Sequence, residues 1–211
     1  MSTVQSRTVR LRRWRLCAFG ACLLATLGLG LPVADAAGLP GVLITVNGRI
    51  RCTGFNTMQK GADVYAITAA HCLVVDKPIT ITEANTGILL GEAVVVFKHH
   101  DLAVLKYAHS SGLATLPLTA SRPTFGAVLW GCGVLQEERE AICFAGLWSG
   151  DTVTYQDVKY PVATLPVRAG FSGGPIGYGD SVFAIYSLRI DNIIVGSTLV
   201  GPAITFLEGV K

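Results

Sequence analysis

Short runs of valine, isoleucine, threonine and aromatic residues recur from residue 42 onward, separated by glycine, proline, asparagine or aspartate. Runs of this kind, bounded by turn formers, predict β-strands. The predicted strands are 42–46, 64–68, 79–82, 93–97, 102–106, 128–131, 141–147, 162–165, 183–188 and 193–199. No long helical period occurs, and only Pro202–Val210 could close the chain as a short helix. The pattern therefore predicts an all-β fold.

The least strand-like stretch is Ala108–Phe125, which contains Ser-Ser-Gly and two prolines. It divides the sequence after the leader into two comparable parts. We interpret residues 111–125 as a linker between an N-terminal β-barrel, 37–110, and a C-terminal β-barrel, 126–211. A single β-sandwich stays open as the alternative, because composition alone does not exclude it.

The chain begins with five arginines between residues 7 and 15, an apolar run over 16–33, and the triplet Ala34-Asp35-Ala36. This order predicts a secretory signal peptide, 1–36, cleaved near Ala36, and therefore a secreted protein, either extracellular or periplasmic. An uncleaved membrane anchor is the weaker alternative, because glycines and a proline interrupt the apolar run. We expect no stable membrane association after cleavage.

Setting the leader aside changes the meaning of the charge. The whole chain has 17 Lys and Arg against 14 Asp and Glu, a formal charge of +3, but five of the arginines and one aspartate lie within 1–36. The remainder has 12 basic and 13 acidic residues, so its net charge is −1. No basic cluster survives that could follow a phosphate backbone, and no nucleic-acid partner is expected.

Four cysteines lie outside the leader, at Cys52, Cys72, Cys132 and Cys143. An even number in an exported chain predicts two disulfides. Of the three pairings, we favour Cys52–Cys72 with Cys132–Cys143, because each closes a local loop within one half of the chain. Zinc bound by Cys52, Cys72 and a histidine, His71 or His99, is the alternative. It is disfavoured because adjacent His71 and Cys72 are awkward ligands for one tetrahedral ion, and we expect neither a metal nor a cofactor.

Three motifs contain the residue types of nucleophilic catalysis, in the order His, Asp, Ser. They are Thr68–Cys72 (TAAHC), Asp101–Leu105 (DLAVL) and Gly170–Pro175 (GFSGGP). Acyl transfer needs an activated hydroxyl, a base that takes its proton and an acid that orients the base. Ser172, His71 and Asp101 are the candidates for these three roles.

The glycines beside Ser172 suggest how the reaction's negative charge is stabilised. Gly170 can adopt a positive φ without steric cost, so that its N–H and that of Ser172 point to one spot as an oxyanion hole. The apolar strand after Asp101 should draw that carboxylate inward, where it can accept the Nδ1 proton of His71. Taken singly, the alternatives are a plain glycine-rich turn for the segment around Ser172 and a solvated loop acid for Asp101.

With Cys52–Phe55 (CTGF) ahead of the histidine motif, these segments resemble the chymotrypsin-like (trypsin-fold) serine proteases, particularly the compact secreted bacterial members. The resemblance spans most of the mature chain. It implies two packed antiparallel six-stranded β-barrels with the active site in the cleft between them, and endopeptidase activity through an acyl-enzyme. The implied partner is a protein or peptide substrate, and we expect a monomer.

The resemblance also implies a substrate-binding region. Its strand at 184–189 would pair with the bound peptide, and Ser187 would lie close to Asp101. The base of the specificity pocket would lie near Leu165, Pro166 and Val167, and its walls would be formed by Tyr186 to Arg189 and by Val195 to Thr198. Candidate substrate-binding residues are therefore Pro166, Val167, Ser187, Leu188 and Arg189.

None of these pocket residues is a carboxylate, so substrates with lysine or arginine in this pocket should be disfavoured. Arg189 or Arg168 could instead favour an acidic side chain, or Arg189 could block the pocket and leave room for a small apolar one. Both alternatives stay open.

The sequence departs from the pancreatic enzymes at Phe171, where those enzymes have an aspartate that pairs with the freed N-terminus. Activation through that ion pair is therefore not expected. Cys132 and Cys143 resemble the second-barrel hairpin disulfide of the bacterial members, with 136–140 as the charged tip.

Two other functions are weighed against proteolysis. A protease-like binding protein without activity would keep the scaffold but not cleave its partner. An α/β-hydrolase esterase would share a Gly-x-Ser-x-Gly segment, but its triad runs Ser, acid, His and its strands alternate with helices. Neither feature matches this chain.

Overall fold

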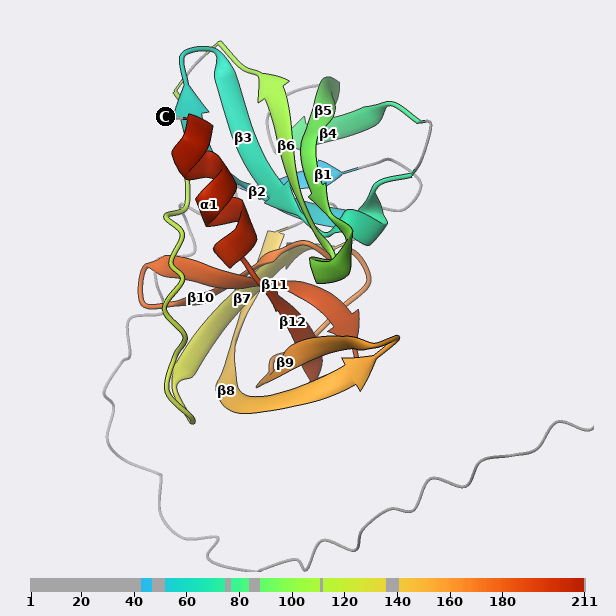
Figure 1. The fold of residues 1–211 in the computed structure, drawn as a ribbon, viewed down its shortest axis with the longest axis vertical. Coiled ribbons are helices and arrows are strands. Elements are labelled where there is room, and N and C mark those ends of the chain that lie inside the picture. The colour runs from blue at the N-terminus through green and yellow to red at the C-terminus, as the bar shows by residue number, and fades with distance from the viewer. Residues whose placement is uncertain are drawn as a thin grey trace, which may run out of the picture. The chain divides into compact units, whose positions relative to one another are not determined.

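A computed structural model describes residues 43–46, 52–74, 77–83, 88–110, 112–135 and 141–210. Its strands form two closed six-stranded antiparallel barrels, which confirms the predicted all-β double barrel (Figure 1). The predicted signal peptide and the charged tip at 136–140 lie outside the described residues. The domain boundaries at 110 and 125 stay predictions.

The first barrel has the strand order β1-β2-β3-β6-β5-β4 and closes through pairing of β1 with β4. Tight antiparallel connections build much of it. For example, β2 and β3 join at a two-residue turn in which Gly61 has a positive φ of 61°. The strands are β1 (Leu43–Val46), β2 (Cys52–Lys60), β3 (Asp63–Thr68), β4 (Ile79–Glu83), β5 (Ile88–Phe97) and β6 (Leu102–Ala108).

The second barrel has the order β10-β11-β12-β9-β8-β7. Its long β8–β9 hairpin turns at Gln156 and Asp157, which both have positive φ, as a twist-matched two-residue hairpin requires. The strands are β7 (Val128–Val134), β8 (Ala141–Tyr155), β9 (Val158–Thr164), β10 (Pro175–Tyr178), β11 (Ser181–Arg189) and β12 (Val195–Leu199). The helix α1 (Gly201–Val210) follows, where the short helix was expected.

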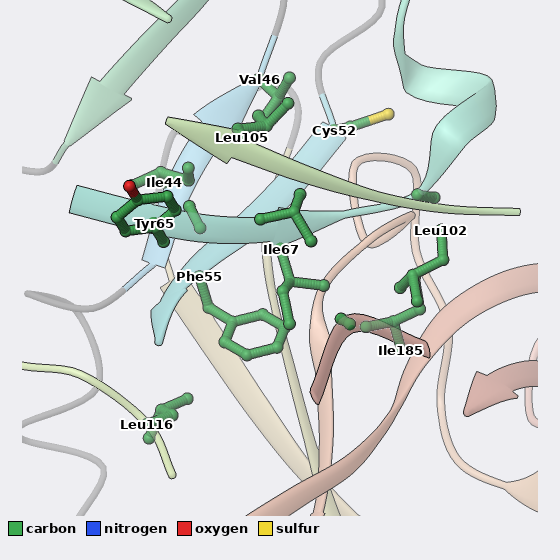
Figure 2. Packing of buried hydrophobic residues seen from close by; sticks show 14 of the residues in the cluster. Ile44, Val46, Cys52, Phe55, Tyr65, Ile67, Leu102, Leu105, Leu116 and Ile185 are labelled. Carbon is green, nitrogen blue, oxygen red and sulfur yellow. The ribbon is translucent and has the colours of Figure 1, made fainter. Parts of the chain in front are cut away.

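Apolar packing continues from one barrel to the other. Phe55 and Ile67 of the first barrel are fully buried in the same cluster as Ile185 from β11 of the second (Figure 2). Burial of such side chains stabilises by about 1.5–3 kcal/mol each. The shared cluster therefore holds the facing loops of the two barrels in a fixed relation.

Both favoured disulfides are present, Cys52–Cys72 in the first barrel and Cys132–Cys143 between β7 and β8 in the second. No helix among the described residues is long and apolar enough to cross a membrane.

Candidate active site

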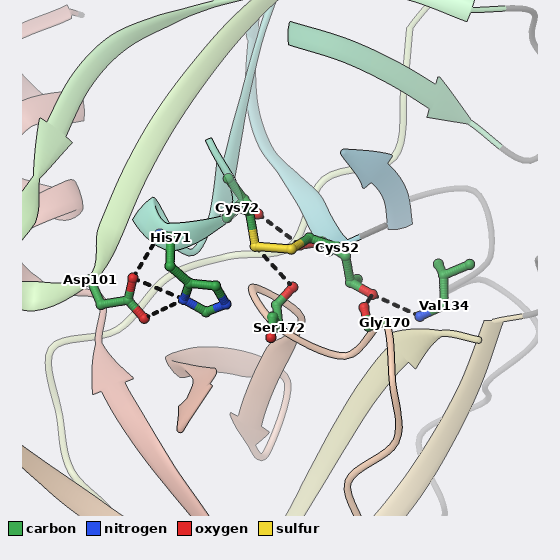
Figure 3. Close-up of a disulfide and its surroundings, with 9 residues drawn as sticks. Cys52, His71, Cys72, Asp101, Val134, Gly170 and Ser172 are labelled. Atoms are coloured by element: carbon green, nitrogen blue, oxygen red, sulfur yellow. Dashed lines mark hydrogen bonds and ion pairs between the residues drawn. A yellow bond between two sulfur atoms is a disulfide. The ribbon is translucent and has the colours of Figure 1, made fainter. Parts of the chain in front are cut away.

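His71 lies in a short 3₁₀ helix, Ala70–Cys72, directly after β3. The next residue, Cys72, is buried and bonded to Cys52 at the start of β2 (Figure 3). The disulfide therefore ties the turn that carries the imidazole to the barrel wall. The His71 side chain itself is 43% exposed and is accessible from solvent.

Asp101 orients the imidazole. Its carboxylate accepts hydrogen bonds from His71 Nδ1, at 2.8 Å to Oδ2 and 3.0 Å to Oδ1, and from the His71 backbone N–H, at 2.9 Å to Oδ1. A carboxylate can only accept, so Nδ1 carries the proton and Nε2 is left as the proton acceptor. The side chain of Asp101 is only 14% exposed, so its carboxylate is largely shielded from water.

The backbone of Asp101 explains how the carboxylate reaches this position. The residue ends a 3₁₀ helix, Lys98–His100, in the left-handed region, with φ 49° and ψ 43°. Aspartate tolerates this conformation better than most residues. The strand β6 begins at the next residue, Leu102, and its first four residues are fully buried, so the chain turns sharply into the barrel and leaves the acid at its rim.

The loop that carries Ser172 is held by backbone hydrogen bonds. The N–H of Gly173 donates to the carbonyl of Tyr186 at 2.8 Å, and the N–H of Gly174 donates to the carbonyl of Phe171 at 2.8 Å. Gly170 has a positive φ of 102°, as predicted from the sequence. A side chain at Gly173 would lie 2.4 Å from the carbonyl oxygen of Thr53, so only glycine fits there.

The N–H groups of Gly170 and Ser172 have no hydrogen-bond acceptor within the described part of the chain. Their carbonyls, by contrast, are both bound by Thr53. Its backbone N–H donates to Ser172 O at 2.9 Å, and its hydroxyl donates to Gly170 O at 2.7 Å. With the carbonyls held away, the two N–H groups remain available to an incoming anion.

Phe171 anchors the same loop from the other side. Its ring is fully buried in the second barrel, 5.5 Å from the ring of Tyr186 and 6.0 Å from that of Phe144, measured between centroids. Phe171, which the resemblance aligns with the aspartate of the pancreatic enzymes, is therefore a buried aromatic residue in this chain.

The loop of Ser172 belongs to the second barrel, between β9 and β10, and the turn of His71 follows β3 in the first. In the view of Figure 3 the imidazole has Asp101 on one side and Ser172 toward the other. The Ser172 carbonyl oxygen lies 3.9 Å from Cys72 Sγ, a packing contact because a disulfide sulfur has no proton to donate. Among the described residues the Ser172 hydroxyl makes no hydrogen bond. Hydrogen bonds between a catalytic hydroxyl and its base are often long in the absence of substrate and shorten when substrate binds.

A pocket of about 140 Å³ opens beside Ser172. Four of the predicted substrate-binding residues line it, Val167, Ser187, Leu188 and Arg189. The fifth, Pro166, does not. Instead, its carbonyl accepts a 3.4 Å hydrogen bond from the hydroxyl of Tyr186, which does line the pocket.

The Ser187 hydroxyl donates to Thr198 Oγ1 at 2.8 Å and makes no hydrogen bond to Asp101 among the described residues. The residue that Asp101 influences there is Tyr160. Burial raises the pKa of Tyr160, and the negative charge of Asp101 raises it further.

A larger cavity, about 480 Å³, has His71 and Asp101 among its lining residues. It has apolar walls, including Leu73, Ile79 and Val96, and Lys77 and Lys98 also line it. His71 and Asp101 therefore line one cavity, and Ser172 lines the other.

Three features of the site were not predicted from the sequence: the double hydrogen bonding by Thr53, the apolar anchoring by Phe171 and the electrostatic effect of Asp101 on Tyr160. The zinc alternative fails on geometry. Cys52, His71 and Cys72 do lie within 4.8 Å of one another, but the two sulfurs are bonded together and cannot act as thiolate ligands.

No protein-family model matches the chain, and no curated protein matches it either. The strand order of the two closed six-stranded antiparallel barrels is consistent with a trypsin-like fold.

Proposed function

We propose that this protein is a secreted serine endopeptidase in which Ser172 is the nucleophile, His71 the general base and Asp101 the residue that orients the base. The observation that carries the proposal is the His71–Asp101 pair, with Nδ1 donating at 2.8 Å, beside a serine loop with two N–H groups that lack an acceptor among the described residues. The three groups come from separate motifs, and the Ser172 carbonyl oxygen lies 3.9 Å from Sγ of Cys72, the residue after His71.

In the proposed reaction, His71 Nε2 takes the Ser172 hydroxyl proton as Oγ attacks the peptide carbonyl carbon. The carbonyl oxygen becomes an oxyanion that accepts hydrogen bonds from the N–H groups of Gly170 and Ser172. The imidazolium then protonates the leaving amine as the C–N bond breaks, and an acyl-enzyme remains. Water, activated by His71, hydrolyses this ester and restores Ser172.

The second barrel offers an edge on which a peptide can lie. Up to Ile185, β11 pairs with β10 on one side and with β12 on the other. From Leu188 to Arg189 only the pairing with β12 continues, and the ladder is shifted by a bulge after Tyr186. A substrate strand adding to this open edge would pass its scissile bond in front of Ser172.

Phe171 supports activity without an N-terminal ion pair. Its ring is already packed in the barrel core, and Thr53 already holds the neighbouring carbonyls. We infer that removal of the leader, rather than insertion of a new N-terminus, yields the active enzyme. No metal or cofactor takes part in the proposed reaction.

A fluorophosphonate probe tests the proposal directly, because it reacts only with an activated serine. We expect labelling of the wild-type protein, no labelling of Ser172→Ala, and loss of about 10⁴–10⁶ in peptide hydrolysis for Ser172→Ala and His71→Ala. Ser110→Ala, an exposed serine away from the loop, is the matched control and should label normally.

The competing function is a protease-like binding protein without activity. If folded wild-type protein is neither labelled nor active on any peptide of a broad library, that alternative is correct and the endopeptidase proposal is wrong. Full peptide hydrolysis by Ser172→Ala would also refute it.

A further inference from the structure

The pocket beside Ser172 contains two arginines and no acid. Arg168 and Arg189 both line it, together with uncharged residues from the loop before Ser172 and from β11 and β12. Arg189 is the last residue of β11, opposite Val195 of β12. Arg168 is three residues before Phe171, whose N–H donates to the Arg168 carbonyl at 3.2 Å.

Neither guanidinium forms an ion pair with a carboxylate in the described part of the chain. The nearest acid in sequence, Asp191, is already engaged. Its Oδ1 accepts hydrogen bonds from the backbone N–H groups of Ile193 at 2.7 Å and Ile194 at 2.9 Å, which closes the turn between β11 and β12. The positive charge at the pocket is therefore not neutralised by the protein's own neighbouring acid.

The rest of the pocket limits what can enter. Its inner wall includes Tyr186 and Val195, each 1% exposed, and the cavity is about 140 Å³. A cavity of this size has room for a side chain of moderate length. A side chain that ends in a carboxylate would lie near the two arginines that line the pocket, and the planar fork of arginine matches a carboxylate with two parallel hydrogen bonds.

We propose that this pocket selects aspartate or glutamate as the residue that donates the scissile carbonyl, with Arg189 and Arg168 as its specificity residues. The inference rests on the proposed endopeptidase function and adds its substrate class, an acidic peptide. Of the two arginines, we expect Arg189 to contribute more to this specificity, because it lies at the end of the strand on which the substrate backbone would lie.

Matched peptide pairs test this without changing side-chain size. Substrates that differ only as Glu against Gln, or Asp against Asn, at this position should differ in kcat/KM by about 10- to 100-fold in favour of the acid. Arg189→Gln and Arg168→Gln should each reduce that ratio. Arg122→Gln, which removes the same charge outside this pocket, should leave it unchanged.

Reversing the charge at Arg189 should shift the preference of the pocket from acidic to basic side chains. Arg189→Glu should raise cleavage after lysine relative to cleavage after glutamate, because the pocket then carries an acid beside Ser172. If Arg189 merely blocks the pocket, wild-type protein would prefer alanine over both glutamate and glutamine, and Arg189→Gln would gain activity on larger side chains. That outcome overturns the proposal.

Fluorophosphonate labelling separates this inference from the proposed function, because the probe carries no peptide side chain. Labelled protein that cleaves the Gln and Glu peptides equally well retains the endopeptidase function and refutes the acidic specificity. Protein that is folded but not labelled refutes both. Binding to the Ser172→Ala variant adds a readout without turnover: the Glu peptide should bind more tightly than the Gln peptide, and high salt should reduce the difference.

Discussion

The hydroxyl of Thr53 donates a 2.7 Å hydrogen bond to the carbonyl oxygen of Gly170, a residue 117 positions later in the chain. The same hydroxyl accepts a 2.8 Å hydrogen bond from the backbone N–H of Val134 on β7. Thr53 is fully buried, so these bonds are not exchanged for bonds to water. One side chain of the first barrel thus fixes two backbone segments of the second.

Thr53→Val should remove both bonds while keeping the side-chain shape. The buried N–H of Val134 and the half-buried carbonyl of Gly170 would lose their partner, which costs about 1–3 kcal/mol of stability. Because the Gly170 peptide would lose its restraint, we expect kcat to fall more than KM rises. Thr53→Ser keeps the hydroxyl and should restore kcat, whereas an effect on packing alone would not be rescued by serine.

Phe171→Ala should create a cavity under the serine loop. The ring contacts Phe144 and Tyr186, and a side chain at Gly133 would lie 2.4 Å from its Cδ1, so the surrounding backbone fits closely around it. Truncation of a buried phenylalanine costs about 3–5 kcal/mol. Urea unfolding measures this loss, and labelling at low temperature, where the variant is folded, reports whether the loop keeps its form. Wild-type stability in the variant would show that the ring does not anchor the loop.

The two disulfides should differ in their effect on activity. They close loops with sequence separations of 20 and 11, and each should contribute about 3 kcal/mol in the chain-entropy account. Replacing Cys52 and Cys72 by alanine should lower both the melting temperature and turnover, because the bond fixes the His71 turn. Replacing Cys132 and Cys143 should lower the melting temperature with a much smaller effect on turnover. Equal losses of turnover in the two double variants would contradict this.

The all-β fold was predictable because strand composition is a local pattern, and the two six-stranded barrels were implied by the resemblance of the motifs to a known family. The catalytic roles of His71, Asp101 and Ser172 stay predictions. The strands that contain a clear run of β-branched or aromatic residues were predicted. The predicted end of one of them was too early, because β8 continues to Tyr155 and not only to Leu147. The strands β2 and β10 were not predicted. Both contain a glycine, β10 starts with proline, and the second half of β2 is polar, so neither has a clear strand composition.

The polar half of β2 is stabilised by distant partners that no local pattern reveals. Asn56 is fully buried, and its Oδ1 accepts a 2.7 Å hydrogen bond from the Tyr107 hydroxyl, which also lies 2.5 Å from Oε1 of buried Glu83. The Thr53 hydrogen bonds and the hydrogen bond from Ser187 to Thr198 are of the same kind. They depend on the packing of segments far apart in sequence, which the motifs do not specify.

Stability at alkaline pH should depend on Tyr186. The ring is 1% exposed in the second barrel, and burial raises the pKa of its hydroxyl well above the ordinary value of about 10. The folded protein therefore holds this proton when the unfolded chain has released it, so the contribution is complete below about pH 10 and is lost as the pH rises further. Tyr186→Phe should make the free energy of unfolding fall less steeply between about pH 9 and 11. A residual slope should remain, because burial also raises the pKa of Tyr107.

Tyr178→Phe is the matched control, because Tyr178 is 48% exposed. Urea titrations across this pH range measure the slopes, and identical slopes for the two variants would show that Tyr186 ionises as readily in the folded protein as in the unfolded chain.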